Sequence, residues 1–173
     1  TFAIMPMVNL SNAMSTFTAQ NIGAGKKERV AEGYHTSLMI LAVVCLVITG
    51  SLYIWGDGMM GLFVDANSSA NVIEVGLEYL HVVSLFYIVM GIMFTTNGLL
   101  RGSGDVIAFT ATTVVNISVR IAFAYLMTPI IGAKSIWWSI VVAWFTGLII
   151  CYARYRSGAW KHKGVVHKAD MEY

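Results

Sequence analysis

The chain has 173 residues, of which 57% are hydrophobic and only 12% are charged, and its formal net charge is +2. Its mean hydropathy of +0.71 is well above what a soluble domain of this length tolerates. These values exclude a water-soluble domain and indicate a chain that lies largely within a membrane. We expect contacts with membrane lipid and none with nucleic acid.

Five stretches are long and apolar enough to cross a bilayer. A helix rises about 1.5 Å per residue, so about 20 apolar residues cross the roughly 30 Å of hydrocarbon. The stretches lack both the polar faces of a soluble helix bundle and the alternation of an outer-membrane barrel. We therefore predict an all-α polytopic membrane protein, with a bundle over residues 1–157 and a basic cytoplasmic tail over 158–173. The five predicted spans are 1–19, 37–54, 79–100, 106–131 and 136–153.

The first stretch ends at a glycine-rich, basic hinge over residues 20–29. Gly23-Ala24-Gly25-Lys26 has a superficial likeness to a phosphate-binding loop. That loop needs four residues between its glycines and a Ser or Thr after the Lys, and neither is present here. No catalytic constellation occurs in any span either. We therefore expect a turn between two spans, and no enzyme, metal site or bound cofactor.

The basic residues are concentrated on one side of the predicted bundle. Nine of them follow the first, third and fifth spans, whereas Lys134 alone lies in the loops on the other side. The positive-inside rule then places the hinge and the C-terminus in the cytoplasm, and we expect a multi-pass protein of the plasma membrane. The nine are Lys26, Lys27, Arg29, Arg101, Arg154, Arg156, Lys161, Lys163 and Lys168.

Small and polar residues recur at helical spacing on the first and third stretches. Helices in lipid pack closely over such residues, so a helix–helix interface is the favoured interpretation. The alternative is the wall of a substrate path. The residues are Ser11, Ser15 and Thr18 on the first stretch, and Ser84, Gly91, Thr95, Gly98 and Gly102 on the third.

Arg120 is the one full charge inside a predicted span, in the middle of 106–131. A charge at that depth costs several kcal/mol unless it reaches water, a partner or backbone carbonyls. Asn116 lies one turn earlier on the same helix face. Two interpretations stay open: the pair faces an aqueous cavity, or Arg120 clamps another helix. Asn97 and Tyr87 are further candidates for a substrate cavity.

A weaker cluster lies at the outer entrance of the third stretch. Glu78 and His81, with Glu74 one turn before them, could relay protons or bind a cation. The alternative is that these side chains are simply solvated at the membrane surface.

Three motifs in the right order resemble the MATE family of multidrug and toxin extrusion transporters. They are the hinge Gln20-Asn21-Ile22-Gly23-Ala24-Gly25-Lys26, the turn Leu100-Arg101-Gly102-Ser103-Gly104-Asp105, and the ending Tyr155-Arg156-Ser157-Gly158-Ala159-Trp160-Lys161. Gln20, Gly23, Gly25, Arg101, Gly102 and Gly104 carry the match as structural residues. The resemblance implies a protein of twelve helices in two six-helix lobes. This chain would be the C-terminal lobe from its second helix onward, with the missing N-terminal lobe as its partner.

The resemblance also implies a function. Members are antiporters that export drugs or other organic, often cationic, compounds in exchange for sodium ions or protons, by alternating access. Several carry a coupling acid in this lobe, at the position that Met90 occupies here. Either the coupling carboxylate belongs to the N-terminal lobe, or the substrate range differs. One alternative is a flippase for lipid-linked precursors of the same superfamily. The other is a non-transporting membrane subunit, which would need no central polar network, so that Asn116 and Arg120 argue against it.

Overall fold

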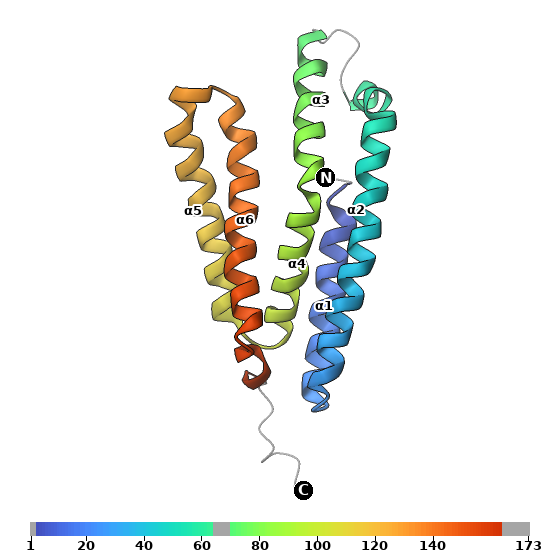
Figure 1. The fold of residues 1–173 in the computed structure, drawn as a ribbon, viewed down its shortest axis with the longest axis vertical. Coiled ribbons are helices and arrows are strands. Elements are labelled where there is room, and N and C mark those ends of the chain that lie inside the picture. The colour runs from blue at the N-terminus through green and yellow to red at the C-terminus, as the bar shows by residue number, and fades with distance from the viewer. Residues whose placement is uncertain (1–2, 64–69, 164–173) are drawn as a thin grey trace, which may run out of the picture.

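The computed structural model describes residues 3–63 and 70–163 of the chain. Three parts of the sequence-based predictions lie outside the described residues. They are residues 1–2 of the predicted span 1–19, Asp65 in the loop between the predicted spans 37–54 and 79–100, and residues 164–173 of the predicted tail. The described residues form six α-helices and a short 3-10 helix (Figure 1). In chain order these are α1 (Met5–Gly23), α2 (Lys27–Phe63), α3 (Ala70–Leu85), α4 (Tyr87–Gly102), α5 (Val106–Ile131), α6 (Lys134–Arg156) and η1 (Ala159–His162).

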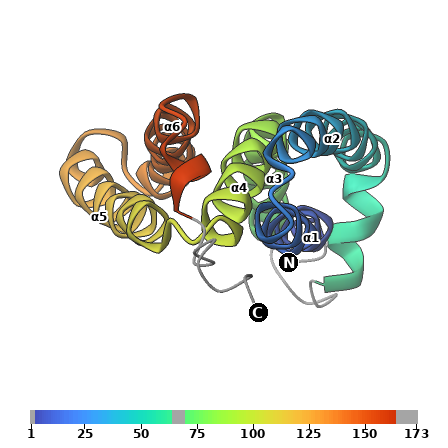
Figure 2. The ribbon, with the colours of Figure 1, turned by 90° about the horizontal axis from the view of Figure 1, so that it is seen from below.

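The helices run along the long axis of the molecule and alternate in direction, except that α4 continues in the direction of α3 (Figure 1). The turn between α1 and α2, the turn between α4 and α5, and the end of α6 all lie at one end, while the α5–α6 turn lies at the other. Seen along the axis, α4 occupies the middle, with α1 and α2 on one side and α5 and α6 on the other (Figure 2). The helix at the centre therefore joins the two halves of the bundle.

The all-α membrane architecture is confirmed, and the described residues contain three or four candidate spans by length and composition. Residues Lys27–Gly56 of α2, all of α5 and all of α6 are each long and apolar enough to cross a bilayer. A fourth span arises if Glu74–Leu85 and Tyr87–Gly102, which meet at a bend of 53°, count as one. The first predicted span, now α1, is not among them. Asparagines and hydroxyl side chains occupy much of this helix and lower its hydropathy.

The bend between α3 and α4 corrects the prediction of one continuous span over 79–100. The helix breaks at Phe86, whose φ of −98° and ψ of 5° are not helical. Thr49 of α2 donates a hydrogen bond to the carbonyl oxygen of Ser84 at 3.0 Å, and the amide of Phe86 reaches back only three residues, to Val83. A side chain that takes up a backbone acceptor in this way is an established cause of helix kinks.

Helix α2 is much longer than the predicted span 37–54, since it begins at Lys27 and ends at Phe63. Hydropathy marks only the part of a helix that lies in hydrocarbon, whereas the polar first turns of α2 extend beyond it. Val30 and Tyr34 in these turns are buried against the bundle. Tertiary packing therefore sustains the helix outside its apolar section.

The small residues of α1 and α4 form a helix–helix interface, as predicted. A Cβ atom at Gly98 would overlap the backbone carbonyl oxygen of Ser11, and one at Gly102 would overlap that of Ser15. The Ser11 hydroxyl crosses the interface and donates to the carbonyl oxygen of Phe94 at 2.7 Å. The two backbones approach this closely because no side chain stands between them.

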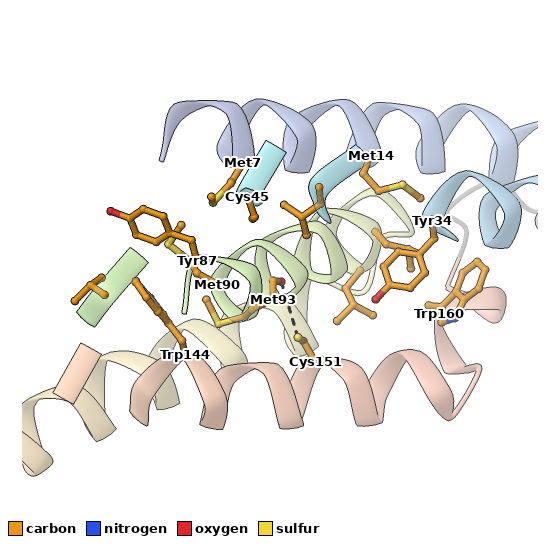
Figure 3. Close-up of a cluster of buried hydrophobic side chains, with 14 of the residues drawn as sticks. Met7, Met14, Tyr34, Cys45, Tyr87, Met90, Met93, Trp144, Cys151 and Trp160 are labelled. Carbon is orange, nitrogen blue, oxygen red and sulfur yellow. Dashed lines mark hydrogen bonds between the residues drawn. The ribbon is translucent and has the colours of Figure 1, made fainter. Parts of the chain in front are cut away.

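Buried side chains gather around α4 and hold the remaining helices to it (Figure 3). Methionines of α1 and α4 fill this core together with Cys151 of α6, whose thiol points toward the carbonyl oxygen of Met93. The end of the bundle with the α1–α2 turn, the α4–α5 turn and the end of α6 is called the basic end. There Tyr34 of α2 packs on Tyr155 of α6, with ring centroids 4.5 Å apart. Trp160 of η1 stacks on the same Tyr155 and is 1% exposed.

Candidate functional site

A cavity of about 310 Å³ opens between α1, α4 and α5. Its volume lies at the lower end of the range of small-molecule sites. Helices α1 and α5 form its two walls and α4 forms its floor. We call it the α4 groove. It is lined by Val8, Ser11, Asn12, Met93, Phe94, Asn97, Arg101, Phe109, Thr112, Thr113 and Asn116.

Asn97 is the most notable polar group of the α4 groove. Its side chain is 8% exposed, and its carbonyl oxygen Oδ1 is fully buried without a hydrogen-bond partner among the described residues. An unpaired buried carbonyl oxygen carries a desolvation cost of about 1–3 kcal/mol. Groups of this kind are usually satisfied by a water, a ligand or another part of the protein. Asn97 is thus prepared to accept a hydrogen bond from outside the described residues.

Asn116 lines the α4 groove from the α5 wall, but its side-chain amide is already engaged. Its side-chain amide donates to the carbonyl oxygen of Ala143 on α6 at 2.6 Å, and it also contacts the sulfur atom of Met93. The amide therefore holds α5 to α6 while its other face lines the α4 groove. Both predicted asparagines are brought to this groove.

Arg101 closes the basic end of the α4 groove by linking three helices. Its guanidinium donates to the side-chain oxygen of Asn12 at 2.8 Å and to the hydroxyl of Ser15 at 3.4 Å. The same group lies over the ring of Phe109, 5.7 Å from the centroid. Arg101 is the only charged residue that lines the groove among the described parts of the chain. The groove thus contains a positive charge and no carboxylate.

Two other predicted cavity residues lie elsewhere. Arg120 is exposed on α5, outside the lining of the α4 groove, and within the described residues it forms no ion pair. The predicted pair of Asn116 and Arg120 is thus divided between the groove and an open helix face. Tyr87 is 5% exposed and packs on Trp144 of α6 in the core, so it does not line the groove.

Glu78 and His81 have separate partners at the opposite end of the bundle. Glu78 pairs with Lys134 at the start of α6, and both side chains are about half exposed. His81 stacks on Tyr53 of α2, with ring centroids 4.6 Å apart. The structure thus gives Glu78 and His81 different partners and does not join them in one cluster.

The motif residues form turns and helix contacts at the basic end. Gly25 and Gly104 adopt positive φ angles of 72° and 84°, and the carbonyl oxygen of Gln20 accepts the amide of Ala24 at the end of α1. Gly23, the last residue of α1, has open space around it, whereas Gly102 contacts α1 directly. Gly23 and Gly25 therefore lie at the α1–α2 turn, and Gly102 and Gly104 lie at the end of α4, next to Arg101.

Sequence reasoning missed Asn12 as a groove residue and treated Arg101 as purely structural. Asn12 is next to Ser11 on the packing face of α1, and Arg101 comes one helical turn after Asn97. Helical spacing alone could have joined Asn97 to Arg101. The contact of both with α1 could not be deduced without knowing which helices are neighbours.

The fold and the groove define a polytopic helical membrane protein with a hollow between its helices that combines apolar walls with a few polar groups, the form in which membrane transporters hold their substrates. The chain belongs to the MatE family, which it matches over residues 1–126. The transporters of this family are not enzymes.

Three relatives extend this family assignment. The chain is 28% identical to the probable multidrug resistance protein YpnP of Bacillus subtilis over 91% of its own length and 35% of the relative. It is 23% identical to the probable multidrug resistance protein NorM of Thermotoga maritima, over 98% of the chain and 37% of the relative. YoeA of Bacillus subtilis, also a probable multidrug resistance protein, is 23% identical over 93% of the chain and 35% of the relative. The chain thus spans about a third of the length of these relatives, and no solved structure matches it.

Proposed function

We propose that this chain forms most of one lobe of a multidrug efflux transporter of the plasma membrane, which exports organic compounds in exchange for protons or sodium ions. The family match carries this proposal, together with the names of three relatives. Because the relatives are about three times as long, a second lobe would be the partner of this chain. The two lobes would enclose the substrate and rock about it, as in other transporters built from repeats.

The α4 groove is the part of the substrate path that this lobe supplies. Its lining combines the aromatic rings of Phe94 and Phe109 with the side chain of Asn97, whose carbonyl oxygen is buried beneath the groove surface and has no partner among the described residues. Apolar walls with a few placed polar groups suit organic molecules of varied shape. Asn97 would accept a hydrogen bond from the substrate or from a water that accompanies it.

In this proposal the coupling carboxylate lies outside the lining of the α4 groove. The lining of the α4 groove contains Arg101 but no Asp or Glu. Asp105 is committed to Arg154, and Glu78 is paired with Lys134. A group whose protonation drives transport must change partners between states, which fits neither pair. For the same reason, the attraction for cationic substrates would come from the other lobe.

The basic end of the bundle faces the cytoplasm in this proposal. The three basic segments of the sequence, at the α1–α2 turn, at the α4–α5 turn and after α6, lie together at one end of the structure (Figure 1). Positive charge is enriched on the cytoplasmic side of membrane proteins. A Lys26→Cys variant would test this orientation, because a membrane-impermeant thiol reagent should not label a cytoplasmic cysteine in intact cells.

The test of the substrate path is Asn97→Ala in the complete protein. We expect drug efflux from cells to fall at least severalfold with membrane abundance unchanged, because the groove loses the free acceptor. Thr95→Val is the matched control. Thr95 lies on the same helix with a buried, unpartnered hydroxyl, but it does not line the groove. Its replacement should leave efflux intact.

Two results would count against the proposal. Equal efflux by the Asn97→Ala variant and the wild type would remove the α4 groove from the substrate path. Absence of gradient-driven drug movement in proteoliposomes of the complete wild-type protein would indicate a non-transporting subunit, whatever the groove does. Imposed proton and sodium gradients in the same vesicles would identify the coupling ion.

A further inference from the structure

A second hollow, unrelated to the α4 groove, lies between the basic ends of α5 and α6. Its volume is about 500 Å³. One wall comes from one face of α5, the other from one face of α6, and the mouth lies beside the last described residue of the chain. We call it the α5–α6 hollow. It is lined by Asp105, Ile107, Ala108, Ala111, Ile150, Ala153, Arg154, Ser157 and Lys163.

The inner part of the α5–α6 hollow is apolar because its walls carry small or aliphatic side chains. Ala108 and Ala111 are one turn apart on α5, and Ile150 and Ala153 are one turn apart on α6. The alanines leave a furrow where larger residues would close the contact between the two helices. Its chemistry and its position along spanning helices fit a hydrocarbon chain.

The rim of the hollow has two cations and one carboxylate. Arg154 donates through Nε to Asp105 at 2.6 Å, and the Asp105 side chain is 1% exposed. An arginine has five N–H donors, and this contact uses one of them. Buried Asp105 thus fixes the orientation of the Arg154 guanidinium. The other four N–H donors of Arg154 have no partner among the described residues and can bind an anion. With Lys163, the rim carries a net charge of one positive unit.

The fold of the C-terminal segment places Lys163 at this rim. Gly158 turns the chain with a φ of 70°, and η1 then lies back on the bundle. Trp160 fixes η1, because its ring is buried and its indole nitrogen donates to the carbonyl oxygen of Tyr155 at 3.1 Å. Lys163 follows directly after this anchored helix. The second cation is therefore positioned by packing.

We propose that the α5–α6 hollow binds one anionic phospholipid, with the phosphate between Arg154 and Lys163 and an acyl chain in the furrow. A phosphodiester carries one negative charge, which matches the net charge of the rim. Basic pockets between spanning helices are a known type of site for anionic headgroups. The site is independent of the substrate path, and it would hold α5 and α6 to the lipid of one leaflet.

The test measures lipid retention by the complete protein. The purified protein is equilibrated in mixed micelles of phosphatidylglycerol and phosphatidylcholine with the same acyl chains, and retained lipid is counted by native mass spectrometry. We expect the wild type to retain phosphatidylglycerol in preference. Lys163→Gln should lower that retention about fivefold, the usual effect of one cation at an anionic lipid surface. Lys161→Gln is the matched control, because Lys161 lies over the Trp160 ring and outside the hollow.

A second pair of variants tests the furrow. Ala111→Leu should fill it and lower retention of both lipids, whereas Ala42→Leu, in a hollow without charged residues between α2 and α3, should not. Equal losses for Lys161→Gln and Lys163→Gln would overturn the proposal in favour of general attraction by the tail. Unchanged retention in Ala111→Leu would also overturn it. Competition by free glycerol phosphate at equal concentration would show that the hollow binds a phosphate group and no lipid.

Discussion

The close approach of α1 and α4 makes Gly98→Ala a sensitive probe of the fold. The added Cβ would overlap the carbonyl oxygen of Ser11, and α1 would have to withdraw by roughly 1 Å to restore a carbon–oxygen contact of about 3.3–3.6 Å. Backbone atoms cannot turn aside as a side chain does. Overpacking of this kind costs about 1–3 kcal/mol.

The same movement weakens two hydrogen bonds that cross the α1–α4 interface. These are the bond from Ser11 to Phe94 at 2.7 Å and the bond from Arg101 to Asn12 at 2.8 Å. Interhelical hydrogen bonds in membranes contribute about 0.6 kcal/mol each on average. Together with the overpacking, we expect Gly98→Ala to lower the free energy of unfolding by about 2–4 kcal/mol.

The assay is size-exclusion chromatography of the complete protein after heating, with the midpoint of loss of the monodisperse peak as the readout. Gly98→Ala should lower that midpoint by several degrees. Gly50→Ala is the control, because Gly50 lies within α2 with open space around it. Gly91→Ala should be intermediate, since its neighbour is the movable side chain of Leu41. If Gly98→Ala and Gly50→Ala lose the peak at the same temperature, α1 and α4 are not in backbone contact.

Two further substitutions examine charged residues. Asp105→Asn removes the charge that holds Arg154, and we expect a loss of about 1.5–3 kcal/mol in unfolding free energy, the usual value of a hydrogen bond to a charged group. Glu78→Gln should cost less than about 1 kcal/mol in the same heating assay, because its pair with Lys134 is solvent-exposed; equal effects would contradict the difference in burial. Arg120→Ala tests the two interpretations of this exposed residue, with efflux and membrane abundance measured together. We expect normal abundance, because Arg120 is exposed and forms no ion pair among the described residues. A fall in efflux would then assign Arg120 to a cavity shared with the rest of the transporter, whereas lost abundance would assign it to a clamp.

The role of small residues on α1 and α4 in helix packing could be predicted because this information is local, although the pairing of α1 with α4 could not. Ser11 and Ser15 recur at one-turn spacing, as do Gly98 and Gly102, and small residues at that spacing have few uses in lipid other than close packing. The alternation of basic and non-basic turns could likewise be predicted from the sequence alone. It leads directly to the gathering of basic segments at one end of the bundle (Figure 1).

The bend at Phe86 and the α4 groove could not be predicted in this way. No proline or glycine marks the bend, and its cause is a hydrogen bond from Thr49, on another helix, to Ser84. The groove likewise depends on which helices are neighbours. The sequence selected Asn97 and Asn116, which line the groove, but also Arg120, which does not. Periodicity shows which residues share a helix face, but it does not show which helix or cavity that face contacts.

The burial of Trp160 has a practical consequence for work on this protein. The aromatic column of Tyr34, Tyr155 and Trp160 ties the last turn of α6 to α2 across the bundle. A truncation that ends before Gly158 would remove the top of this column and expose two tyrosine rings to detergent. A fluorescent reporter should therefore be joined beyond Lys163, where its attachment leaves the indole ring in place. In a variant whose other four tryptophans are replaced by Phe, quenching of Trp160 fluorescence would then report whether the end of the lobe is folded.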